Sequence, residues 1–165
     1  MLNKLIKTAL CTTLLASSIS VFAGDLTVSQ SITVNASPET TWKMIGDFNH
    51  LDVWHPVVVK SELTSGDSQT LGSIRVLTLG NGAQITEKLV VNDNANKTYS
   101  YAITESPLPV DDYVGTITVT AAEAGKSIVT WSSTFNAKDA TDEESKASTL
   151  GIYDAGLNNL GKHFN

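Results

Sequence analysis

The stretch GSIRVLTLGNGAQITEKL, residues 72–89, contains the clearest structural pattern in the chain. Two runs typical of β-strands flank Gly80-Asn81-Gly82, which is a strong signal for a hairpin turn. Successive side chains of a strand point to opposite faces of a sheet. One face of the second strand therefore carries Ala83, Ile85, Glu87 and Leu89. This pattern places a carboxylate on an otherwise apolar face.

The length of the hairpin loop decides which residue of the first strand lies opposite Glu87. A three-residue loop with Gly82 in the left-handed conformation pairs Arg75 with Glu87 on the inner face. A two-residue Asn81-Gly82 loop instead pairs Arg75 with Lys88 on the outer face and brings like charges together. We favour the three-residue loop, and we interpret an inward ion pair as part of a pocket wall.

The N-terminal residues 1–23 are typical of a secretory signal peptide. Lys4 and Lys7 give it a positive start, and Thr8–Phe22 is mostly apolar and small. The segment is too short and too weakly apolar for a membrane span. We expect cleavage after Ala23 and a periplasmic or secreted mature protein.

Removing 23 residues from 165 leaves a mature chain of 142 residues, enough for one domain over residues 24–165. The signal peptide contains two of the eleven basic residues and none of the seventeen acidic ones, so the mature net charge is −8. This charge argues against nucleic acid or an anionic membrane as the main partner. The single cysteine, Cys11, lies in the signal peptide, so we expect no disulfide.

The rest of the chain alternates in the same manner as the hairpin. Leu26–Val34 is a half-buried strand, Ser37-Pro38 starts a short helix that ends near Ile45, and Asp47–Leu51 reads as a second helical turn. Six strands are expected to follow at Val57–Leu63, Ser73–Leu79, Ala83–Val91, Thr98–Thr104, Tyr113–Ala121 and Ser127–Phe135.

After Asp139 the period changes to that of a helix with an acidic start. Its apolar positions are Ala147, Leu150, Tyr153, Leu157, Leu160 and Phe164. Gly151, Gly156 and Gly161 each weaken a helix by about 1 kcal/mol relative to alanine. They either allow close approach to a neighbour or are merely tolerated. The fold class is therefore α+β: a seven-stranded antiparallel sheet too wide for its one long helix, so that side chains or a cavity fill the remainder.

The element order and several landmarks resemble the SRPBCC superfamily, which includes START, birch-pollen-allergen and polyketide cyclase/dehydrase proteins and has the helix-grip fold. The landmarks are Trp42, Phe48 through Trp54-His55-Pro56, Gly72-Ser73-Ile74-Arg75, Gly82 through Glu87-Lys88-Leu89, Tyr101 through Pro107-Leu108-Pro109 to Tyr113, Trp131 and the C-terminal helix. The resemblance covers the whole mature chain. It implies a sheet wrapped around the last helix.

Within the superfamily the chain is most similar to the bacterial polyketide cyclase/dehydrase-like branch. In its expected localisation and its size it resembles exported members such as the MxaD accessory protein of methanol oxidation. The fold hosts carriers, cyclases and hydrolases alike, so the resemblance specifies the fold better than the function.

The candidate ligand-binding residues combine the inward ion pair with inward aromatic side chains. They are Arg75, Glu87, Trp54, His55, Tyr99, Tyr101, Tyr113, Trp131 and Tyr153. Arg75 and Glu87 either offer polar groups to a ligand in the pocket or close on each other and only orient the hairpin. Buried tyrosine hydroxyls need partners, so the inward tyrosines predict polar points in the lining or a shared network with the ion pair.

His55 is the best candidate for acid–base chemistry because histidine titrates near neutral pH. The alternative is a histidine at the pocket mouth that makes one backbone hydrogen bond. The three histidines are scattered, so we expect neither a metal site nor a cofactor. Ser106-Pro107-Leu108-Pro109-Val110 forms either a rim of the entrance or a plain connection between strands.

We expect a non-enzymatic protein that binds a small hydrophobic or amphipathic molecule. The alternatives are an accessory protein that docks to a partner enzyme, and a cyclase or dehydratase that uses His55 or the Arg75–Glu87 pair. An open apolar cavity favours ligand binding, whereas a closed core favours docking.

Overall fold

A seven-stranded antiparallel sheet forms the body of the protein in a computed structural model that describes residues 24–165. The predicted signal peptide, residues 1–23, lies outside the described residues. The strand order is β1-β7-β6-β5-β4-β3-β2. The strands are β1 (Leu26–Val34), β2 (Val58–Ser65), β3 (Ile74–Leu79), β4 (Gln84–Asp93), β5 (Thr98–Glu105), β6 (Val110–Ala121) and β7 (Ser127–Ala137). Order, number and direction of the strands confirm the predicted fold class.

The helices α1 (Pro38–Ile45) and α3 (Asp142–Phe164) begin after residues whose side chains cap them, whereas α2 (Leu51–Trp54) has no side-chain cap. In α1, the Ser37 side chain accepts a hydrogen bond from the backbone N–H of Thr40. The long helix α3 begins with a capping box formed by Thr141 and Glu144. The short helix α2 lies later in the chain than the predicted Asp47–Leu51 turn and shares only Leu51 with it.

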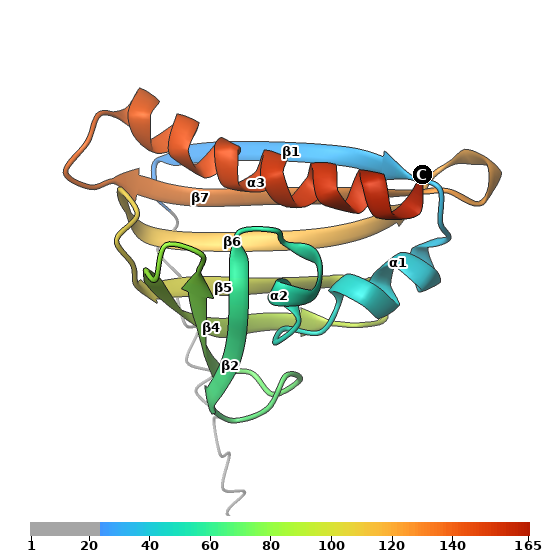
Figure 1. The fold of residues 1–165 in the computed structure, drawn as a ribbon, viewed down its shortest axis with the longest axis horizontal. Coiled ribbons are helices and arrows are strands. Elements are labelled where there is room, and N and C mark those ends of the chain that lie inside the picture. Colours follow the sequence, from blue (N-terminus) through green and yellow to red (C-terminus); the bar gives the residue numbers. More distant parts are fainter. Residues whose placement is uncertain (1–23) are drawn as a thin grey trace, which may run out of the picture.

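The layers are unequal in width. Figure 1 shows α3 lying along β1 and β7 at one end of the sheet, while β2 at the other end runs steeply across that direction. The two shorter helices lie beside α3. The helices therefore leave part of the inner face to side chains, as the width argument predicts. Among residues 24–165, no helix is both long and apolar enough to cross a bilayer.

Among the strand boundaries, the start of β6 differs most from the sequence prediction. Strand β6 starts at Val110, three residues before the predicted Tyr113, because Val110 pairs with Ala137. The register of β6 against β7 then shifts between Asp111 and Val114. Such an irregularity interrupts the period-two alternation from which strands are predicted.

The inward face of α3 is more polar than predicted. Ala147 is exposed, so its assignment to the buried face is wrong, and Ser145 and Thr149 are buried instead. The Ser145 hydroxyl donates to the Pro109 carbonyl at 2.8 Å, and the Thr149 hydroxyl donates to the Ser145 carbonyl at 2.9 Å. Both hydroxyls thus have partners inside the fold, which removes the penalty for burying them.

Candidate functional site

The β3–β4 hairpin has the three-residue loop. The backbone N–H of Leu79 donates to the Ala83 carbonyl at 2.9 Å, and that of Gly82 donates to the Leu79 carbonyl at 2.8 Å. Gly82 has a φ of +83°, a conformation that suits glycine. Arg75 consequently lies opposite Glu87. The predicted register is confirmed, and the two-residue alternative is excluded.

The Arg75–Glu87 pair is buried, with 0% and 4% of the two side chains exposed. Both contacts reach the same carboxylate oxygen: Arg75 Nε donates to Glu87 Oε2 at 2.7 Å, and Nη2 lies 2.6 Å from it. The Phe48 ring centroid lies 4.2 Å from Arg75 Cζ, which is cation–π distance. The guanidinium is thus held between a carboxylate and an aromatic ring.

Burial and ion pairing have opposite effects on the pKa values of Arg75 and Glu87. Burial raises the pKa of the Glu87 carboxyl above its usual value, and the Arg75 guanidinium opposes that shift. Burial alone would lower the pKa of Arg75, but the Glu87 charge and hydrogen bond, together with the nearby Tyr99 and Tyr101, outweigh it, and the Arg75 pKa is raised. Each group therefore depends on the other to remain charged inside the protein.

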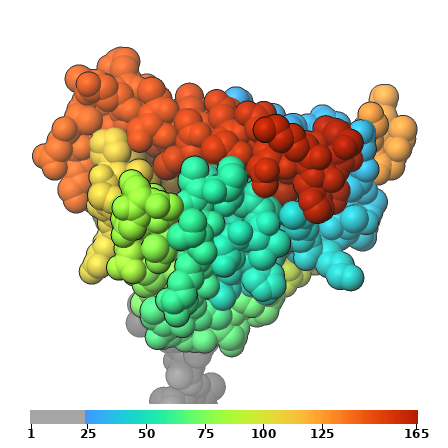
Figure 2. Space-filling model, viewed as in Figure 1, coloured from blue at the N-terminus to red at the C-terminus, as the bar shows by residue number. Residues whose placement is uncertain are grey.

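A cavity of about 50 Å³ lies beside the pair, between the sheet and α3. Its walls are mostly apolar, and several polar side chains reach it. It is lined by Leu51, His55, Val57, Val58, Leu77, Leu79, Ile85, Glu87, Tyr101, Ile103, Leu108, Tyr113, Trp131, Thr149, Ile152 and Tyr153. In Figure 2 the segments around Val57, the β3–β4 turn, the loop before β6 and α3 meet on one face of the molecule.

The structure brings six of the nine predicted site residues to this cavity. They are Glu87, His55, Tyr101, Tyr113, Trp131 and Tyr153. Arg75, Trp54 and Tyr99 do not line it. Arg75 lies behind Glu87, and Trp54 packs edge-on against Trp131 with ring centroids 5.4 Å apart. The pair therefore presents a carboxylate to the cavity and keeps its guanidinium in the core.

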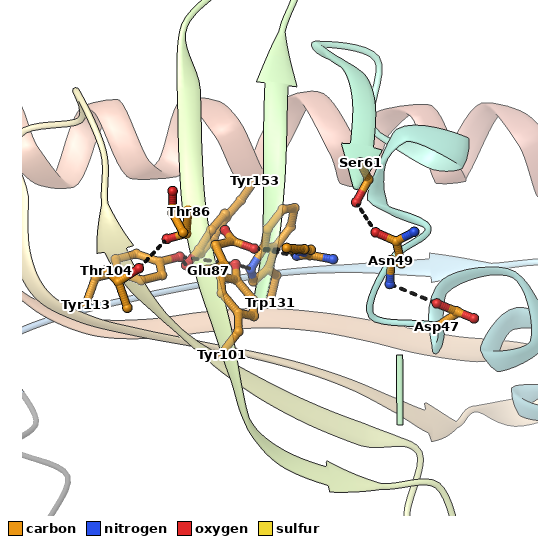
Figure 3. A network of polar contacts seen from close by, with 11 residues as sticks. Asp47, Asn49, Ser61, Thr86, Glu87, Tyr101, Thr104, Tyr113, Trp131 and Tyr153 are labelled. Carbon is orange, nitrogen blue, oxygen red and sulfur yellow. Dashed lines mark hydrogen bonds and ion pairs between the residues drawn. The ribbon is translucent and has the colours of Figure 1, made fainter. Parts of the chain in front are cut away.

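The inward tyrosines form a chain of hydroxyls (Figure 3). Trp131 Nε1 donates to the Tyr101 hydroxyl at 2.9 Å, and that hydroxyl lies 3.4 Å from the Tyr113 hydroxyl. The Tyr113 hydroxyl lies 2.5 Å from that of Tyr153. Burial raises the pKa of all three tyrosines well above 10. They are therefore neutral hydrogen-bonding groups at physiological pH.

Tyr99 lies outside this chain. Its hydroxyl is buried, and it has no hydrogen-bond partner among the described residues. Burial raises the pKa of Tyr99 to about 12, while the nearby Arg75 opposes the shift. Tyr99 is thus a neighbour of the ion pair rather than of the cavity.

His55 makes one backbone hydrogen bond. Its Nε2 lies 2.9 Å from the Ile152 carbonyl oxygen, so Nε2 carries the hydrogen and Nδ1 is left as an acceptor. Burial lowers the pKa of His55, and the hydrogen bond to Ile152 partly opposes this. The contact needs Gly156, since a β-carbon there would lie 2.5 Å from His55 Cδ2. His55 is accordingly a neutral imidazole fixed against α3.

Several wall residues were not predicted. Thr149 and Ile152 stand near Tyr153 on α3 at helical spacing, a signal that could have found them. Leu108 lines the cavity, so the Pro107-Leu108-Pro109 segment contributes to its wall. Phe48 does not line the cavity but packs on Arg75, and its position in the loop between α1 and α2 has no such periodic signal.

A family model described as polyketide cyclase / dehydrase and lipid transport matches residues 25–165, the whole described domain except its first residue. The chain belongs to this family. Membership confirms the SRPBCC resemblance, and this fold family binds small hydrophobic ligands.

Solved structures of bacterial proteins share the fold. The protein XoxI from Bacillus cereus is 36% identical, with a TM-score of 0.78 over 84% of this chain and 94% of its own. An uncharacterised protein from Bacillus thuringiensis is 35% identical, with a TM-score of 0.79 over 84% of this chain and 98% of its own. A Nitrosospira multiformis protein at 22% identity, with a TM-score of 0.76 over 85% of this chain and 97% of its own, supports the fold alone.

Proposed function

We propose that this family member binds a small hydrophobic or amphipathic molecule between the sheet and α3, without transforming it. The observation that carries the proposal is a cavity with aliphatic and aromatic walls and one carboxylate, Glu87, at its side. Such a lining suits a ligand with an apolar body and one polar group. Because His55 is buried and its Nε2 is held by α3, we favour binding over catalysis.

The size of the cavity sets a condition on binding. About 50 Å³ is less than twice the roughly 30 Å³ that one water molecule occupies in the liquid, whereas ligand pockets usually span about 300–1,000 Å³. A ligand must therefore displace part of the wall. Leu79, Leu108 and Ile152 are only partly buried, and Val57 is exposed, so side chains from four segments are free to move outward.

Export is part of the proposal. The basic start and small apolar run of residues 1–23 support a signal peptide, and a ligand carrier would then act in the bacterial envelope. N-terminal sequencing of the protein from its host should begin at Gly24. A mature protein that starts at Met1 would refute export by cleavage.

Docking to a partner protein is a second candidate, as the resemblance to the MxaD accessory protein implies. It is favoured by exposed valines at and beside β2, an edge strand: Val53 and Val59 are 58% and 62% exposed. Crosslinking in the host, with Val59→Lys as the control, tests it. One stoichiometric partner lost in the variant would favour docking.

Native mass spectrometry of protein purified from its own host tests the binding proposal. We expect an added mass of a few hundred daltons or less, removed by mild denaturation and refolding. Repeated preparations with no added mass, together with one stoichiometric partner, would replace the ligand carrier with the accessory protein.

A further inference from the structure

We infer that the cavity selects ligands that carry a neutral hydroxyl group, an alcohol or a phenol, over ethers, carboxylates and amines of the same size. The inference rests on the proposed binding function and names the polar group of its ligand. The inference follows from which hydrogen-bond donors and acceptors of the polar wall side chains are already used and which remain unused.

Glu87 provides the first acceptor. The Arg75 Nε hydrogen bond and the Nη2 ion-pair contact both end on Oε2, so Oε1 accepts no hydrogen bond from the described residues. Oε1 belongs to the one carboxylate on the cavity wall, and Arg75 does not reach that wall. A carboxylate oxygen accepts hydrogen bonds and donates none while it is ionised. The cavity thus offers a fixed, unused acceptor.

The Thr149 and His55 side chains on the wall have no hydrogen left to donate. Thr149 donates its hydroxyl hydrogen to the Ser145 carbonyl, which leaves only lone pairs. His55 donates through Nε2 to the Ile152 carbonyl, and its buried Nδ1 has no partner among the described residues. The Cδ2–Nε2 edge of the ring faces Gly156 on α3, so Nδ1 points away from the helix. A ligand that only accepts hydrogen bonds finds no matching donor in this group.

The tyrosine chain supplies at most one donor. Three hydroxyls, those of Tyr101, Tyr113 and Tyr153, make two contacts with one another, and the Trp131 N–H is already bound to Tyr101. Two of the three hydroxyl hydrogens are therefore used, and one remains. A ligand hydroxyl, which donates and accepts, fits a wall with several acceptors and one donor.

The charge of the wall excludes ionised ligands. Glu87 is already compensated by Arg75, so the buried pair is neutral as a unit. A ligand carboxylate would place a second negative charge beside Glu87, and an ammonium would leave an excess positive charge in an apolar cavity. A neutral hydroxyl avoids both penalties.

The test uses four probes with the same chain length: 1-hexanol, its isomer methyl pentyl ether, hexanoate and hexylamine. Binding to the full protein is followed by tryptophan fluorescence, since Trp131 lines the cavity. We expect 1-hexanol to bind roughly ten- to a hundred-fold tighter than the ether, because the ether gives Glu87 Oε1 no hydrogen-bond donor. We expect the two ionised probes to bind more weakly still.

The variant R75L/E87L provides a matched control. Apolar replacement of a whole buried ion pair is often tolerated, and circular dichroism checks its folding. It should bind 1-hexanol and the ether within about threefold of each other. Equal affinities in the parent protein, or tighter binding of hexanoate or hexylamine, would overturn the inference while leaving the binding function intact. Failure of all four probes would also overturn it, and only native mass spectrometry without a retained molecule would remove the binding function as well.

Discussion

Arg75 and Glu87 illustrate how a buried charge is kept in an apolar core. Each loses its water on folding, and that loss is offset by the other charge, at 2.6–2.7 Å. For Arg75 the Phe48 and Tyr101 rings contribute as well. Each member of the pair thus depends on its partner in the folded protein, whether or not a ligand binds. Removing one partner leaves the other charge buried without compensation.

Glu87→Gln should lower the free energy of unfolding by about 3–5 kcal/mol, because Arg75 then remains charged and unpaired in the core. Urea unfolding of the parent and the variant measures this difference. Glu62→Gln is the matched control: Glu62 forms an exposed ion pair with Lys60, and its loss should cost about 1 kcal/mol or less. Equal effects of the two substitutions would contradict the buried-pair account.

His55 predicts a pH dependence of stability. Burial lowers its pKa below the usual 6.5, so between the two values the unfolded chain binds a proton that the folded chain does not. The free energy of unfolding should therefore fall as pH drops below about 6.5, by at most about 1.4 kcal/mol per pH unit. Urea unfolding at pH 7.5 and 5.5 measures it.

Two histidine variants isolate this effect. His55→Gln should show a smaller loss of stability between pH 7.5 and 5.5 than the parent. His163→Gln, at an exposed position, should keep the parental loss. A His55→Gln protein with the full parental pH dependence would show that other groups cause it.

The three glycines of helix α3 have different structural roles. A β-carbon at Gly156 would lie 2.5 Å from His55, and one at Gly161 would lie 2.6 Å from Ile32. A β-carbon at Gly151 would meet nothing within 4 Å. Close packing against a neighbouring side chain therefore explains Gly156 and Gly161. Gly151 is merely tolerated in the helix.

Alanine substitutions at two of these positions should act in opposite directions. Gly151→Ala should raise the free energy of unfolding by about 0.5–1 kcal/mol through helix propensity alone. Gly156→Ala has the same propensity gain, but crowding of His55 should cost about 1–3 kcal/mol and give a net loss. Thermal and urea unfolding of both variants test this, and a stabilised Gly156→Ala protein would contradict the close packing.

The whole molecule joins a wide curved sheet to a helix that covers one end of it. The remaining inner face is filled by aromatic side chains and leaves a cavity of about 50 Å³. Binding of a molecule larger than water therefore requires movement of segments that belong to different elements. The β3–β4 turn and the loop before β6 supply partly exposed wall residues, so we expect them to move.

Amide hydrogen exchange should detect this opening. Addition of 1-hexanol should slow exchange in residues 77–85 and 103–110, because ligand contacts hold these wall segments in place. Residues 118–128, around the β6–β7 turn, do not line the cavity and should be unaffected. Uniform protection of both regions would indicate general stabilisation rather than binding at this cavity.

The sequence by itself determined much of the fold. Period-two alternation predicted the strands, and the Gly80-Asn81-Gly82 loop predicted the hairpin register. The Arg75–Glu87 pairing followed from these two predictions. The capped start of α1 at Ser37 and the acidic start of α3 after Asp139 were also readable, because these signals act between residues close in the chain. The sheet's excess width over its single long helix then indicated a cavity.

Tertiary structure alone decided what the cavity wall presents. Arg75 lies behind Glu87, His55 turns one nitrogen to the Ile152 carbonyl, and α3 buries Ser145 while it exposes Ala147. These outcomes depend on contacts between residues far apart in sequence, whose geometry no local period encodes. The size of the cavity likewise follows from how closely side chains of separate elements pack, which is why the sequence predicted a pocket but neither its volume nor its hydrogen-bonding character.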